Sequence, residues 1–140
     1  MNKNEFILVI NGNPVSASRP RVAQRSSYYN EPYRSYKATL AKETANALPK
    51  DSGLLFEPYA PLSVEIVYEM PIPKMSAKKA NEMIGMYHTK KPDLDNLDKA
   101  ILDAMSGRVF KDDSQVCKLS AVKKYSYTPC TIVIVRKIEL

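Results

Sequence analysis

Alternating side chains between residues 62 and 70 limit the fold of this chain more than any other feature. Leu62, Val64, Ile66, Tyr68 and Met70 are apolar, and most of the residues between them are polar. Successive side chains of a β-strand point to opposite faces of a sheet, so this pattern predicts a strand with one face on a core. The fold must therefore contain a sheet that is covered on one side.

The other periodic segments supply the remaining strands and the helices that cover them. In chain order we expect a buried strand, a helix, the alternating strand, a weak short helix, a second clear helix and two final strands, over residues 6–10, 32–48, 62–70, 76–86, 97–105, 115–124 and 130–137. Gly107 stands where glycine commonly ends a helix. This order predicts one α+β domain over residues 1–140, with a mixed sheet of about four strands and helices packed on one face.

The charge balance indicates the kind of partner. Lysine and arginine total 21 against 15 aspartate and glutamate, which gives a net charge of +6. A surplus of this size suits a polyanion, because neutralised phosphates release condensed counterions. Charge alone therefore permits nucleic acid as a partner without requiring it.

Several other classes are excluded by what the sequence lacks. With one histidine, His88, and with Cys117 and Cys130 outside any CxxC pair, a structural zinc site is not expected. We interpret the two cysteines as buried free thiols on neighbouring strands. No glycine-rich phosphate loop indicates a nucleotide cofactor. The longest apolar stretches are strand-sized, so we expect a cytoplasmic protein without membrane contact.

Three aspartates are candidate ligands of a metal ion. Asp93 and Asp95 stand where a loop enters the second clear helix, and Asp113 directly precedes a strand. Three gathered carboxylates make an oxygen site suited to Mg²⁺, which activates water and stabilises the leaving oxygen in phosphodiester hydrolysis. Lys99 lies one helical turn after Asp95, where it is placed to steady a carboxylate or offset charge in the transition state.

Each of these residues also has a structural interpretation. Asp93 or Asp95 can be a helix N-cap, Asp112 and Asp113 can form a turn, and Lys99 can belong to an exposed ion pair. Taken singly the residues favour these interpretations, whereas their combination in a basic protein favours a metal site. An EF-hand fails at Asp98, where glycine is required.

The residues around the aspartates resemble a known family. KKPDLDNLDKA at residues 90–100, followed by VFKDDSQV at residues 109–116, is similar to the paired motif of the RusA Holliday-junction resolvases, which phages and prophages commonly encode. The resemblance implies a homodimer that makes paired symmetric nicks in four-way DNA junctions during recombination or repair, with Mg²⁺ or Mn²⁺. By motif position it implies essential roles for Asp93, Asp95 and Asp113, and a supporting role for Lys99. It gives secondary roles to Asp103 and Asp112.

Basic residues ahead of this motif are candidates for DNA contact. Arg19-Pro20-Arg21 also resembles the phage members of the family, and phosphate contacts of this kind position DNA without reading its sequence. We expect Tyr28 and Tyr29 either to stack on bases at a branch point or to pack on the core. The DNA-binding candidates are Arg19, Arg21, Arg25, Arg34, Lys90 and Lys91.

Two other functions stay open at this point. A non-catalytic, structure-selective DNA-binding protein would bind junctions without cutting them, and a nuclease of flaps or forks would share the aspartates. The complete acidic set argues against the first, whereas the sequence does not separate the second from a junction nuclease. His88 is interpreted as a surface residue rather than a catalytic base.

Overall fold

The computed structural model describes residues 4–18, 21–23, 26–28, 31–51 and 53–139. Its main sheet has four strands in the order β1-β6-β4-β5. These are β1 (Glu5–Asn11), β4 (Leu62–Pro71), β5 (Val116–Ser126) and β6 (Cys130–Lys137). β6 pairs antiparallel with β1 and β4, whereas β4 and β5 are parallel. The predicted α+β class with a mixed sheet is confirmed.

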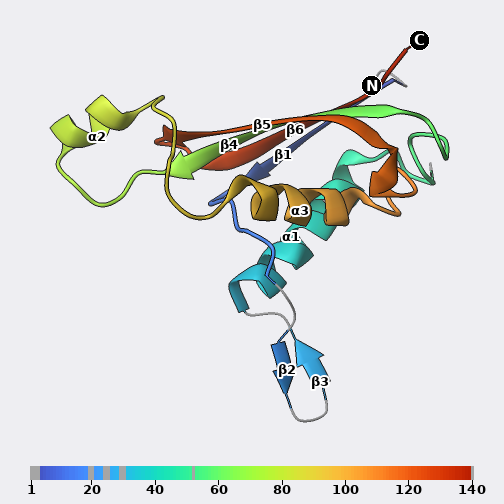
Figure 1. Ribbon diagram of the computed structural model, residues 1–140, viewed down its shortest axis with the longest axis horizontal. Coiled ribbons are helices and arrows are strands. Elements are labelled where there is room, and N and C mark those ends of the chain that lie inside the picture. Colours follow the sequence, from blue (N-terminus) through green and yellow to red (C-terminus); the bar gives the residue numbers. More distant parts are fainter. Residues whose placement is uncertain (1–3, 19–20, 24–25, 29–30, 52, 140) are drawn as a thin grey trace.

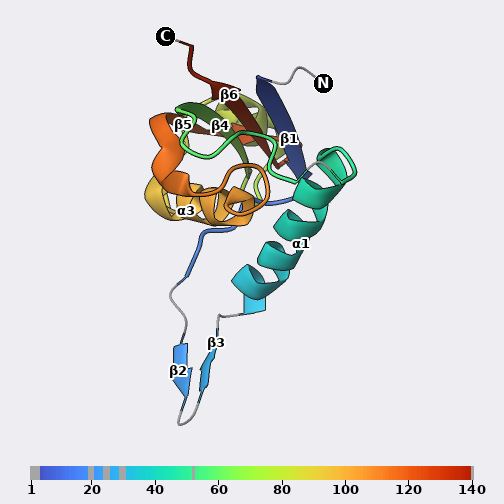
Figure 2. The same ribbon diagram turned by 90° about the vertical axis from the view of Figure 1, so that its right-hand side faces the viewer.

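The two longest helices cover one face of this sheet. Figures 1 and 2 show α1 (Glu31–Ala47) and α3 (Leu94–Met105) on the same side, with the opposite face of the sheet uncovered. The short α2 (Ala77–Met83) lies beyond the ends of β4 and β5 (Figure 1). The prediction that helices pack on one face is therefore also confirmed.

A small hairpin extends from the body of the molecule. It consists of β2 (Arg21–Ala23) and β3 (Ser26–Tyr28), which pair antiparallel. Both views show it reaching away from the main sheet beyond the start of α1 (Figures 1 and 2). The sequence pattern did not predict these strands, because strands of three residues are too short to show a periodic pattern.

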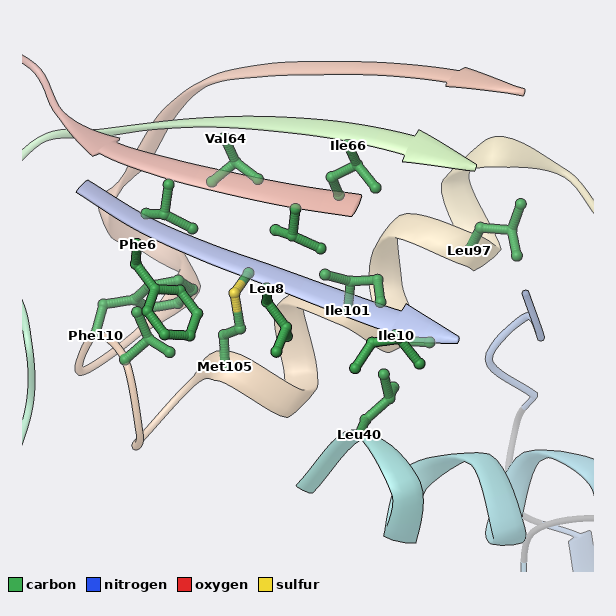
Figure 3. Packing of buried hydrophobic residues seen from close by; sticks show 14 of the residues in the cluster. Phe6, Leu8, Ile10, Leu40, Val64, Ile66, Leu97, Ile101, Met105 and Phe110 are labelled. Atoms are coloured by element: carbon green, nitrogen blue, oxygen red, sulfur yellow. The ribbon is translucent and has the colours of Figure 1, made fainter. Parts of the chain in front are cut away.

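The core lies between the sheet and the two long helices. Apolar side chains from alternate positions of β1, β4 and β6 meet the apolar stripes of α1 and α3, as Figure 3 shows for Leu8, Ile66, Leu40 and Ile101. Removing such apolar surface from water is the main stabilising contribution in a domain of this size.

The uncovered face explains a wrong expectation about the first strand. Residues 6–10 were predicted to be wholly buried, but Ile7 and Val9 are about half exposed, at 50% and 49%. Only Phe6, Leu8 and Ile10 face the helices and are buried. The continuous apolar run reflects an apolar row on the open face, where Val9, Ile132, Val67 and Val122 are successive cross-strand neighbours.

The path from β4 to β5 places the functional segments. These parallel strands are connected through α2 and α3. α3 therefore begins at the end of the sheet where both strands finish, and it ends where both strands start (Figure 1). Gly107 follows the helix with φ +79°, a left-handed conformation that favours glycine, as its position in the sequence predicted.

The two cysteines are not on neighbouring strands, because β4 lies between β5 and β6. Cys117 is exposed rather than buried, and both thiols are free. Burial and the adjacent Glu69 carboxylate raise the pKa of the Cys130 thiol to about 11. Among the described residues, no helix has the length and apolar character needed to cross a membrane.

Candidate active site

Asp93 and Asp95 lie at the start of α3. Asp93 occupies the N-cap position with extended backbone, but its side chain makes no capping hydrogen bond. Asp95 is in the first turn, and its carboxylate accepts a hydrogen bond from the Asn96 N–H at 3.0 Å. Both side chains are exposed. The partial positive charge of a helix N-terminus stabilises carboxylates at this position. The Asp93 carboxylate does not cap the helix, and among the described residues Asp95 accepts only the one bond from Asn96.

Lys123 fixes the segment that leads into this helix. Its ammonium group donates to the carbonyl oxygens of Lys90 and Pro92, both at 2.7 Å. Lys123 belongs to β5 and lies beside Tyr68 of β4 on the helix-facing side of the sheet. The chain immediately before Asp93 is thereby attached to the sheet by a charged donor, and such charge-assisted bonds are stronger than neutral ones.

A second contact anchors the first turn of α3. The buried Tyr68 hydroxyl donates to Oδ1 of Asp98 at 2.6 Å. Burial raises the pKa of Asp98, the tyrosine hydrogen bond opposes this rise, and the nearby Asp95 carboxylate adds to it. Burial also raises the pKa of Tyr68, so the phenol stays protonated as the donor. Asp98 is 9% exposed and acts as a link between helix and sheet rather than as a surface carboxylate.

Three lysines surround the two aspartates. Lys90 and Lys91 precede Asp93, and Lys99 follows Asp95 by four residues on the same side of α3. All three side chains are exposed, and none forms an ion pair within the described part of the chain. The interpretation of Lys99 as half of a surface ion pair is therefore not met. Its charge stays available beside the Asp95 carboxylate.

Asp112 and Asp113 have different positions in a short 3-10 turn, η1 (Asp113–Gln115). The Asp112 side chain caps this turn, accepting from the Ser114 N–H at 3.1 Å. The side-chain oxygen of the buried Gln115 accepts a hydrogen bond from the Asp112 backbone N–H, and its amide nitrogen donates to the carbonyl oxygens of Glu57 and Ala60. Asp112 is thus structural, whereas the Asp113 carboxylate is exposed and unpaired among the described residues.

The structure does not bring Asp113 to the other two aspartates within one chain. α3 contains 12 residues, so its ends are about 18 Å apart at roughly 1.5 Å per residue. Asp93 stands at one end, and the turn with Asp113 follows the other end (Figure 1). Along β5, Val116 and Lys123 are similarly separated by about 23 Å at roughly 3.3 Å per residue.

A single copy therefore does not gather the expected metal ligands. No group of three histidine, cysteine, aspartate or glutamate side chains suited to a metal ion occurs in the described part of the chain. A cavity of about 370 Å³ between α1 and α3 includes Asp103 and Arg108 in its lining but none of the three candidate ligands. The assignment of Asp93, Asp95 and Asp113 to one metal stays a prediction that one chain alone does not satisfy.

The arginine candidates are only partly described. Arg19 and Arg25 lie outside the described residues, as does Tyr29. Arg21 and Tyr28 belong to the hairpin strands, with their backbones described but not their side chains. Arg34 forms an exposed ion pair with Glu31 in the first turn of α1. The hairpin that carries Arg21 reaches away from the sheet (Figure 2).

Sequence reasoning missed the residues that hold the site in place. Asp98 lies on the buried stripe of α3 with Leu97, Ile101 and Met105, at helical spacing. That spacing was the available signal. Lys123 gave no such signal, because its function depends on the carbonyls of a distant segment.

His88 was interpreted as a surface residue. Its side chain is half-buried against the Tyr125 ring, and burial lowers its pKa.

Comparisons with known proteins identify the family of this chain. A family model described as "Endodeoxyribonuclease RusA" matches residues 11–136. The chain is also 31% identical, over 137 residues, to "Uncharacterized protein YqaN" of Bacillus subtilis (strain 168). That match covers 91% of this chain and 93% of the relative. The family match includes all the candidate site residues.

Proposed function

Because this chain belongs to the RusA endodeoxyribonuclease family, we propose that it is a Mg²⁺-dependent Holliday-junction resolvase. It acts as a homodimer and makes paired symmetric nicks in four-way DNA junctions. The observation that carries this proposal is the exposed Asp93–Asp95 pair at the start of α3, which Lys123 and the Tyr68–Asp98 bond hold against the sheet. A carboxylate pair that is exposed yet rigidly supported is suited to chemistry rather than to folding.

The charges around the pair suit a phosphodiester substrate. Lys90, Lys91 and Lys99 present exposed ammonium groups on both sides of the two carboxylates along the chain. These cations attract the DNA backbone and offset the negative charge that develops on the phosphate oxygens during hydrolysis. Oxygen ligands such as these carboxylates are those that Mg²⁺ prefers. Two carboxylates are only part of such a ligand set, so we assign no metal-borne step to a single copy.

The hairpin and α2 provide further contacts for DNA arms. The hairpin extends away from the body of the molecule, and its first strand contains Arg21. Lys74, Lys78 and Lys79 are exposed on and just before α2, beyond the ends of β4 and β5. Contacts of this type bind phosphates without sequence selection, and they weaken steeply with added salt.

The dimer follows from the symmetry of the substrate. A four-way junction has two strands to be cut in equivalent positions, and an isologous pair of subunits supplies two equivalent sites. A monomer would instead release singly nicked junctions. Paired cuts within one binding event are therefore the product that distinguishes a resolvase from a general nuclease.

A substrate panel tests this function. Wild-type protein is incubated with Mg²⁺ and a labelled mobile four-way junction, and with linear duplex, flap and fork substrates of matched length. We expect symmetric paired nicks in the junction and far slower cutting of the other substrates. Preferential cutting of flaps or forks would support a nuclease activity but overturn the assignment of the four-way junction as its substrate. Salt-dependent junction binding without cleavage in Mg²⁺ or Mn²⁺ would show a non-catalytic DNA-binding protein.

A further inference from the structure

A tyrosine occupies the tip of a tight turn between α1 and β4. Residues 57–60 form this turn, which is closed by a hydrogen bond from the Ala60 N–H to the Glu57 carbonyl oxygen at 3.1 Å. Pro58 is the second residue of the turn and Tyr59 is the third, with a φ of +68°. A proline followed by a residue of positive φ is typical of a type II turn, whose third residue is usually glycine or asparagine. Tyr59 therefore stands where a bulky side chain strains the backbone.

The fold gains little from an aromatic ring at this position. Tyr59 is 90% exposed, whereas its neighbours Phe56 and Ala60 are buried and attach the turn to the core. Glycine or asparagine would adopt the same backbone conformation with less strain and would expose no additional core surface. The stability of the turn thus does not explain why its tip carries a tyrosine.

Tyr59 also differs from the two other exposed tyrosines. The Lys124 ammonium group lies over the Tyr87 ring, 5.2 Å from its centre, and the Tyr127 hydroxyl donates to the side-chain oxygen of Asn81. The Tyr59 side chain has no hydrogen bond or ring contact with the described residues. Its ring is therefore accessible to a ligand.

The turn that presents this ring is firmly held. The Gln115 amide nitrogen donates to the carbonyl oxygens of Glu57 and Ala60, at 3.0 and 3.1 Å. Lys137 pairs with the Glu57 carboxylate at 2.5 Å. An aromatic ring on a fixed backbone loses little conformational freedom when it binds a ligand, which favours binding.

Gln115 also connects this turn to the candidate active site. Its side-chain oxygen accepts hydrogen bonds from the backbone N–H groups of Lys111 and Asp112, at 3.1 and 3.3 Å. One side chain therefore joins the turn of Tyr59 to the turn that carries Asp113. Both turns lie at the end of the sheet where β4 and β5 start. The exposed ring is thus held close to a carboxylate that the proposed function assigns to catalysis.

We propose that Tyr59 stacks on a base at the branch point of the DNA, and so contributes to the selection of branched over linear substrates. This inference rests on the proposed function. In an open four-way junction, each arm ends in a base pair that lacks a stacking neighbour on one side. An aromatic side chain can replace that neighbour, and it does so for any of the four bases. A linear duplex offers no such base along its length, so its binding does not depend on the ring.

A protein surface, including that of a second copy, is the competing occupant of the ring. The connection to the Asp113 turn favours DNA, because the substrate must reach that carboxylate. The two occupants also give different results when the ring is removed. Loss of a protein contact changes the sedimentation of the protein, whereas loss of a stacking contact changes DNA binding alone.

The test measures binding in EDTA, where cleavage does not occur, to a labelled four-way junction and to a linear duplex of the same length. Tyr59→Asn is expected to weaken junction binding by about 5- to 150-fold, the range that stacking on one base supplies, with little change for the duplex. Tyr59→Phe keeps an aromatic ring and should bind the junction like wild type. Tyr127→Asn is the matched control, since it also replaces an exposed tyrosine, and it should bind like wild type.

Two further readings show whether the ring acts on the DNA or on the fold. With 2-aminopurine at the branch point, the saturated wild-type complex should fluoresce less than the Tyr59→Asn complex, because stacking quenches this base. Urea denaturation of Tyr59→Asn should give a midpoint equal to or above that of wild type, because asparagine tolerates a positive φ.

Three results would overturn the stacking role while leaving the proposed function intact. One is Tyr59→Asn that binds the junction as tightly as wild type. Another is an equal loss of binding to junction and duplex. The third is a loss of junction binding accompanied by a lower urea midpoint or altered sedimentation, which would assign the ring to the fold or to a protein contact. Wild-type protein that neither prefers branched DNA nor cuts it would defeat the proposed function, and the stacking role with it.

Discussion

Lys123 donates to the carbonyl oxygen of Pro92 at 2.7 Å, and the same ammonium group also contacts the carbonyl of Lys90. This single side chain connects β5 to the residues directly before Asp93. Its position is set by the pairing of β5 with β4, where Lys123 is the neighbour of Tyr68. The placement of the candidate catalytic carboxylates is thus determined by the register of the sheet rather than by the loop itself.

Replacing Lys123 tests whether this attachment positions the active site. Lys123→Met is expected to lower junction cleavage by about 10- to 100-fold, the usual cost of losing an outer support. Because the support acts through Asp93, the Mg²⁺ concentration for half-maximal cleavage should rise while junction binding changes little. Lys123→Arg retains a charged donor and should recover part of the activity. Lys124→Met is the matched control on the same strand, and equal losses in both variants would contradict a positioning role.

The Tyr68–Asp98 hydrogen bond is expected to stabilise the fold. Tyr68→Phe removes the donor to a buried carboxylate, so the free energy of unfolding should fall by about 1.5–3 kcal/mol. Urea denaturation measures this change. Tyr36→Phe is the control, because the partners of the buried Tyr36 hydroxyl are neutral: the Thr131 hydroxyl, at 3.4 Å, and the backbone of Val15. A smaller loss for Tyr68→Phe than for Tyr36→Phe would contradict the account.

The raised pKa of Asp98 predicts a pH dependence of stability. Between the unfolded pKa, about 4, and the higher folded pKa, the folded chain binds more protons than the unfolded chain. This group therefore makes stability fall as pH rises through that window. Asp98→Asn should remove this part of the slope, seen as the difference in urea midpoint between variant and wild type across pH. Asp103→Asn, on the exposed face of α3, should leave the slope unchanged, and equal effects would count against the assignment.

The sequence was most informative where the local pattern alone determines the structure. Alternation from Leu62 to Met70 predicted β4 and its buried face, and the stripe from Leu97 to Met105 predicted most of α3. The burial of residues 6–10 was misjudged, because a local pattern does not show whether a layer covers the second face of a sheet. The β2–β3 hairpin was missed because its strands, of three residues each, are too short to show a periodic pattern.

In the candidate site, too, the residues found from the sequence are those marked by a local pattern. The aspartates and Lys99 were found from motif and residue type, whereas Lys123 and Tyr68 act through partners that are distant in sequence. Whether Asp113 meets Asp93 depends on the direction in which α3 runs between them. That direction follows from the parallel pairing of β4 and β5, which no local pattern revealed.

The most direct test of the central claim compares wild-type protein with Asp95→Asn on one labelled four-way junction, measuring cleavage and binding in the same Mg²⁺ buffer. We predict paired symmetric nicks by the wild type and no cleavage by the variant. Junction binding should be unchanged or tighter in the variant, because a negative charge near phosphates is removed. Equal cleavage by both proteins would contradict the assignment of this aspartate to the active site of a junction nuclease.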